Sequence, residues 1–235
     1  MTLIMFGTRE LTRSSEPGAV FSLLFRVVRF AVVCFLMSAV ELAAVSAAER
    51  AVIILAPAID DDRLEPTYDA IAFWNETFVA LGLDLHLGSP DVIAGVPRAV
   101  ETYARLIALR AGRLPVPEDL EPSVPAELKQ LDADIVLVLS RQNIMSYAWR
   151  LPRIESGRHL VVIRQVRGLD RGDPMVSRHV IAHELGHTLG LLHNEESHTL
   201  MCGPCQPLAA ESDSRGFLPL TVDDHNALRE RYAAP

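Results

Sequence analysis

The sequence predicts an α/β (α+β) domain in which buried β-strands alternate with amphipathic helices. Three short apolar runs, at 51–56, 134–140 and 159–164, have the length and composition of buried strands. Longer segments such as Pro66–Leu81 carry their apolar residues at helical spacing. Strands and helices in alternation are typical of a sheet that is covered by helices.

Length fits one domain of ordinary size, and charge excludes one class of partner. The chain has 235 residues and a formal net charge of −8, so it lacks the basic surface that nucleic-acid-binding proteins need. We therefore expect no nucleic acid partner. Lys129 is the only lysine among 22 basic residues, a bias that favours a GC-rich bacterial genome.

Residues 1–48 are predicted to be a signal peptide. Four arginines precede the apolar run Phe30–Val40, and small residues lie between that run and Ala48. Cleavage there would release a domain of residues 49–235 that is secreted or periplasmic. The alternative is an uncleaved membrane anchor, the only membrane contact that we expect. However, the run is shorter than the roughly 20 residues that a spanning helix needs, and the charged residue Glu41 ends it.

The domain is expected to open with the strand at 51–56, followed by the helix Pro66–Leu81, which Gly82 ends. Leu83–Leu87 alternates apolar and polar residues, which predicts a half-exposed strand with His86 on its polar side.

The middle of the chain contains a second helix and two irregular segments. Pro97–Ala111 is predicted to be helical, with its proline in the first turn. Four prolines between Leu114 and Pro125 predict a surface loop or an inserted segment. The segment 141–154 is either an edge strand that lines a cleft or a plain surface loop, and we favour the cleft wall.

Two helices are predicted in the last third of the chain. Met175–Leu189 has Ser177 or Asp173 as a candidate N-cap. Thr221–Tyr232 has Thr221 as its N-cap and two aspartates in its first turn.

The most informative stretch is His183–His193, which reads His-Glu-Leu-Gly-His-Thr-Leu-Gly-Leu-Leu-His. Histidines four residues apart lie about 6 Å apart on one face of a helix, so His183 and His187 can bind one metal ion. Gly190 can end the helix and turn the chain, so that His193 returns as a third ligand. Three histidines leave one tetrahedral position of Zn²⁺ open to water, the pattern of a single catalytic zinc ion.

Glu184 follows the first histidine and can reach a water molecule at the metal without binding the metal itself, as a general base must. A lone His-x-x-x-His pair is usually an ordinary surface or core feature. The added Glu184, Gly190 and His193 make the metal site the better interpretation. His179 lies one turn before His183, and because the ligand set is already complete, we interpret it as a supporting or solvated residue.

This pattern, His-Glu-x-x-His-x-x-Gly-x-x-His, resembles the signature of the metzincin clan of zinc endopeptidases. Metzincins also have a methionine turn beneath the zinc, and Met201 follows His193 by eight residues, the spacing of the matrixin family. The segment Leu220–Tyr232 resembles the matrixin C-terminal helix with its paired aspartates. The resemblance covers residues 130–232 well and residues 50–95 weakly.

The resemblance implies a metzincin-like zincin domain with a twisted, mixed and mostly parallel sheet, an active-site helix and a C-terminal helix. It also implies an extended peptide or protein substrate that pairs with a cleft-edge strand. The chain departs from matrixins at Asn194, where they usually have serine, and at Cys202-Gly203, which separate Met201 from Pro204. The sequence also has no cysteine-switch propeptide, so the subfamily stays open.

Cysteine spacing leaves three interpretations open. Cys34 lies in the targeting segment, which leaves Cys202-Gly-Pro-Cys205 in the domain. In an oxidising compartment this pair is expected to form a disulfide that braces the methionine turn. The other two interpretations are a thioredoxin-like redox pair and a structural zinc site that includes His198.

The expected function is that of a secreted or periplasmic zinc endopeptidase, in which Zn²⁺ activates water and Glu184 is the general base. The alternative is a zinc-binding module that recognises proteins without cleaving them. The presence of Glu184 argues against this alternative, because such a module has no chemical need for the carboxylate.

Overall fold

The computed structural model describes residues 48–110, 122–152, 157–165, 174–205 and 216–233, all of which belong to one compact unit. The predictions for residues 1–47, for Asp173 and for most of the proline-rich segment lie outside these residues. Among the described residues, no helix has the length and apolar character needed to cross a membrane.

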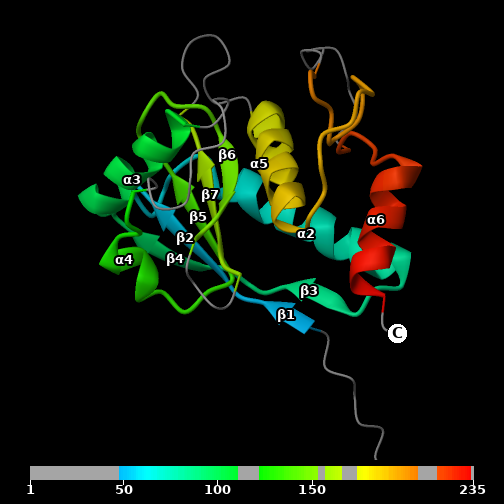
Figure 1. Cartoon of the computed structure of the whole chain (residues 1–235), viewed down its shortest axis with the longest axis horizontal. Coiled ribbons are helices and arrows are strands. Elements are labelled where there is room, and N and C mark those ends of the chain that lie inside the picture. Colours follow the sequence, from blue (N-terminus) through cyan, green and yellow to red (C-terminus); the bar gives the residue numbers. More distant parts are fainter. Residues whose placement is uncertain (1–47, 111–121, 153–156, 166–173, 206–215, 234–235) are drawn as a thin grey trace, which may run out of the picture. The chain divides into compact units, whose positions relative to one another are not determined.

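A five-stranded sheet with the order β4-β2-β5-β7-β6 forms the centre of the domain (Figure 1). Its strands are β2 (Val52–Ala56), β4 (Asp91–Ala94), β5 (Ile135–Leu139), β6 (Tyr147–Arg150) and β7 (His159–Ile163). Four strands run parallel, and β6 pairs antiparallel with β7 at one edge. The three predicted buried strands are confirmed, and the segment 141–154 supplies the edge strand β6.

A second sheet has two short parallel strands, β1 (Ala48–Arg50) and β3 (Leu85–Leu87). The side chain of His86 is exposed and its two neighbours in β3 are buried, as the alternating pattern predicts. This confirms the half-exposed strand.

Helices cover both faces of the central sheet (Figure 1). They are α2 (Leu64–Leu81) and α5 (Pro174–Thr188) on one face and α3 (Arg98–Ala108) and α4 (Ala126–Lys129) on the other. The last helix, α6 (Val222–Tyr232), adds Leu228 to the core that contains α2 and α5. Because side chains alternate along a strand, Ile54 and Leu137 pack in the core with α2 and α5. Their neighbours Leu55 and Val136 pack with α3 and α4 on the other face. The predicted mixed α/β fold is confirmed.

Helix ends follow local rules with one exception. Gly82 adopts the left-handed conformation, with φ of 68°, and ends α2 as predicted. Thr221 forms a capping box with Asp224 at the start of α6, also as predicted. The prediction of Ser177 as an N-cap is wrong, because α5 already begins at Pro174 and Ser177 is buried inside the helix. Proline is well suited to the first turn because it lacks the N–H that a helix start leaves unsatisfied.

Candidate active site

His183 and His187 project from the same face of α5, one turn apart. The helix ends after Thr188, and Gly190 turns the chain with φ of 92°. Residues with a Cβ atom rarely adopt such a positive φ, so this turn favours glycine. This turn brings His193 back toward α5, as the sequence predicts.

The three histidines converge through their Nε2 atoms. Nε2 of His193 lies 3.1 Å from Nε2 of His183 and 3.1 Å from Nε2 of His187. A tetrahedral zinc ion with bonds of 2.0–2.1 Å spaces its ligand nitrogens about 3.3 Å apart. Among the described residues, these three form the only set of three or more His, Cys, Asp or Glu side chains that is placed to hold a metal ion.

Backbone carbonyls fix the orientation of two of the rings. Nδ1 of His183 lies 2.7 Å from the carbonyl oxygen of Leu200, and Nδ1 of His187 lies 2.9 Å from that of Leu191. A carbonyl oxygen only accepts, so each Nδ1 carries the proton and each Nε2 presents a lone pair. Burial lowers the pKa of both side chains, that of His183 to about 4, which keeps the imidazoles neutral. Facing lone pairs on neutral rings fit a divalent cation.

Glu184 and the three histidines line one cleft, and Glu184 is only 7% exposed. Burial raises the pKa of its carboxyl to about 7, although a backbone hydrogen bond from Ala148 acts in the opposite direction. A carboxyl with this pKa can exchange protons near neutral pH.

Met201 packs against α5, the helix that carries His183 and His187, and is completely buried. A Cβ atom at Gly186 would lie 2.6 Å from the sulfur of Met201 and 3.1 Å from the indole of Trp74. That indole also donates a hydrogen bond of 2.9 Å to the carbonyl of Ala182. Sequence reasoning missed Gly186, although glycine in the middle of a helix is a signal of close packing.

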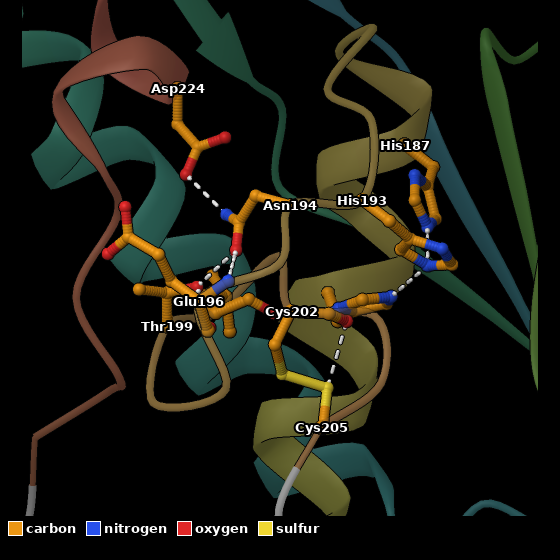
Figure 2. The surroundings of a disulfide bond; sticks show 10 residues. His187, His193, Asn194, Glu196, Thr199, Cys202, Cys205 and Asp224 are labelled. Carbon is orange, nitrogen blue, oxygen red and sulfur yellow. Dashed lines mark hydrogen bonds between the residues drawn. A yellow bond between two sulfur atoms is a disulfide. The ribbon is translucent and has the colours of Figure 1, made fainter.

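Cys202 and Cys205 are joined by a disulfide, with Cα atoms 5.0 Å apart, immediately after Met201 (Figure 2). Both cysteines line the cleft. Between them, Gly203 lies against the ring of His193, since a Cβ atom there would be 2.7 Å from Cγ of the histidine. His198 is exposed and belongs to no metal-binding group among the described residues.

His179 is buried and lies outside the group of three histidines. Its Nδ1 donates to the carbonyl of Met175, at 2.7 Å, and its Nε2 accepts from the backbone N–H of Leu218, at 3.1 Å. His179 thus connects α5 to the segment that precedes α6, in agreement with a supporting role.

A cleft of about 730 Å³ contains the three histidines and Glu184. Its walls come from β6 and the two residues before it, the residue after β7, α5 and the segments between α5 and α6. They comprise Met145, Ser146, Tyr147, Ala148, Arg164, Val176, His179, Val180, Leu200, Cys202, Cys205 and Leu218. The prediction that the segment 141–154 lines a cleft is confirmed.

Comparison with known families agrees with this geometry. Residues 145–233, somewhat less than half of the chain, match the family model of the matrixins. Over these residues the chain is similar to the matrixins. No curated protein sequence matches the chain.

Solved structures show partial likeness to this chain. Archaemetzincin from Methanopyrus kandleri is 14% identical, with a TM-score of 0.41, over 80% of this chain and 97% of that one. Metalloproteinase-II from Bacteroides fragilis is 14% identical, with a TM-score of 0.45, over 81% of this chain and 55% of that one. A chain described as part of a chaperone–substrate complex is 16% identical, with a TM-score of 0.42, over 68% of this chain and 29% of that one.

Proposed function

We propose that the protein is an exported endopeptidase in which His183, His187 and His193 bind one catalytic zinc ion. The observation that carries this proposal is the convergence of three Nε2 atoms. In two of these rings, Nδ1 donates a hydrogen bond to a backbone carbonyl. In that arrangement the lone pairs face one another, which is unfavourable unless a cation lies between them.

Glu184 is proposed to be the general base. A zinc ion in such a site acts as a Lewis acid that lowers the pKa of water and polarises a peptide carbonyl. Glu184 accepts the proton that the attacking water loses and returns it to the leaving amine. Its burial supports this role, since a pKa near 7 allows the carboxyl both to take up and to release a proton at neutral pH.

The proposed substrate is an extended peptide that lies along β6. This strand pairs with β7 on one side, and no other described strand pairs with its second edge. Tyr147 and Ala148 of β6 also line the cleft beside Glu184. A free strand edge binds an extended peptide through main-chain hydrogen bonds.

Export of the protein is proposed from its N-terminal sequence, with retention by an uncleaved anchor as the alternative. The Cys202–Cys205 disulfide supports export, because disulfides persist in oxidising compartments. The mass of the protein recovered from outside the cytoplasm tests this: loss of residues 1–48 supports cleavage, and a full-length mass in the membrane fraction contradicts it.

The test of the activity uses the full chain, in parallel with Glu184→Gln and His187→Ala. We measure zinc by elemental analysis and cleavage with a peptide library. We expect one zinc ion per wild-type chain, retained zinc with at least about a hundredfold loss of cleavage in Glu184→Gln, and loss of stoichiometric zinc in His187→Ala. Wild-type protein without zinc contradicts the ligand assignment, and near-normal turnover by Glu184→Gln contradicts the general base.

A further inference from the structure

We infer that Asn194 is a positioning residue that fixes the orientation of the zinc ligands by linking their segment to the start of α6. This inference rests on the proposed function, in which His183 and His193 bind zinc. It concerns the position at which the chain has asparagine where matrixins usually have serine. Figure 2 shows Asn194 between Asp224 on one side and Glu196 and Thr199 on the other.

The backbone of Asn194 pairs with the segment that follows Met201. Its N–H donates to the carbonyl of Met201, and its own carbonyl accepts from the N–H of Gly203, both at 2.8 Å. Gly203 in turn lies against the ring of His193. The position of the third ligand therefore depends on how these two short segments lie together.

The side chain of Asn194 uses both its acceptor and its donor. Oδ1 accepts from the N–H of Glu196, at 3.0 Å, and lies 2.9 Å from the hydroxyl of Thr199, whose one proton it shares with the carbonyl oxygen of Glu196 at 2.8 Å. Nδ2 donates to Oδ2 of Asp224 across 3.3 Å. Asp224 is buried, and the same oxygen accepts from the N–H of Thr221 at the start of α6. The amide of Asn194 thus stabilises the turn formed by residues 194–199 and links that turn to the start of α6.

The hydrogen bond between Asn194 and Asp224 also affects His183, a second proposed zinc ligand. The turn that Asn194 closes leads directly to Leu200, whose carbonyl accepts from Nδ1 of His183. Displacement of the turn would therefore move a partner of His183 and the support of His193 together. Groups that orient metal ligands through hydrogen bonds commonly change metal affinity by about 10–100-fold when they are mutated.

The chemistry of the amide identifies the variants that test this role. Asn194→Asp has nearly the same shape and keeps the acceptor, but it replaces the donor with an oxygen that faces Asp224. Combining it with Asp224→Asn supplies a donor from the other side, although that nitrogen can no longer accept from the N–H of Thr221. Asn194→Ser keeps a hydroxyl for its own turn but is too short to reach Asp224. Thr221→Ala is the matched control, because it removes the cap of α6 and leaves the Asn194–Asp224 link intact.

The experiment measures the dissociation constant for zinc by chelator competition, and the visible absorption of the Co²⁺-loaded protein, on the full chain. We expect Asn194→Asp to weaken zinc binding by about 10–100-fold and to alter the cobalt spectrum. We expect the double variant to recover much of the affinity, and Thr221→Ala to stay within about threefold of the wild type. If Asn194→Asp does not fold, Asn194→Ser decides the question, with a weakening of about tenfold or more expected.

Wild-type affinity and an unchanged cobalt spectrum in the folded Asn194 variants would overturn the inference. Equal weakening in Thr221→Ala would overturn it too, since the effect would then arise from the stability of α6 alone. Both results leave the proposed function standing. A wild-type chain that binds no zinc would instead refute the proposed function, and with it this inference.

Discussion

The central sheet and the segment 190–203, which carries His193 and Met201, are stabilised by different kinds of interaction. The sheet is stabilised by apolar side chains that alternate between two cores, so many residues share each role. The segment 190–203 depends instead on single hydrogen bonds and on two glycines that touch their neighbours. A substitution in the sheet should therefore change stability alone, whereas a substitution around the segment should also change metal binding.

Leu160→Ala tests the sheet side of this comparison and has the largest expected effect on stability. Leu160 is fully buried in the core with α3 and α4, on the face of the sheet that lies away from α5. Loss of its side chain leaves a cavity that should lower the free energy of unfolding by about 2–5 kcal/mol. Denaturant titration measures the loss, and chelator competition should give an unchanged zinc affinity for the folded protein. A tenfold weaker affinity would show that the two regions are coupled.

Gly186→Ala tests the segment 190–203, because Gly186 of α5 packs against Met201 of that segment. In an ordinary helix this change stabilises, because glycine is worth roughly 1 kcal/mol less than alanine. Here the added methyl group would overlap the sulfur of Met201, so we expect a loss of about 1–3 kcal/mol in unfolding free energy, together with weaker zinc binding. Gly216→Ala is the matched control, since no atom lies within 4 Å of its added Cβ. Stabilisation by Gly186→Ala would show that Met201 is not tightly packed against Gly186.

The sequence predicts well the features to which many residues contribute, as in the sheet, or which depend on local spacing. Apolar periodicity places the strands β2, β5 and β7 and the helix α2 to within two residues at each end, because many side chains contribute to each pattern. The motif also predicts which histidines meet, since their spacing on a helix and across one turn is a local property.

Contacts between segments that lie far apart in the sequence have no such local signal. Nothing in the sequence indicates that Leu200 supplies the carbonyl for His183, or that Asn194 reaches Asp224 thirty residues later. The error at Ser177 has a related cause, because a serine near a helix start suits a cap in isolation. The structure buries this serine within α5 instead.

Acid sensitivity is the smallest effect that we predict, and it originates at the sheet. His159 begins β7, and its pKa is lowered to about 4, first by burial and then by the nearby charges of Arg50, Arg150 and Arg231, with Asp134 acting in the opposite direction. The native state therefore keeps His159 neutral at a pH where the unfolded chain, with a pKa near 6.5, takes up a proton. This contribution to stability is complete above about pH 6.5 and is lost as the pH falls toward 4.

The measurement compares the unfolding free energy of the wild type with that of His159→Gln at pH 7 and pH 5. Both proteins contain the same other histidines, so the titrations of His183 and His187 cancel in the difference. Because His159 is partly exposed, we expect the wild type to lose only about 1 kcal/mol more than the variant over this range. Equal losses in the two proteins would remove His159, and with it this part of the sheet, as a source of acid sensitivity.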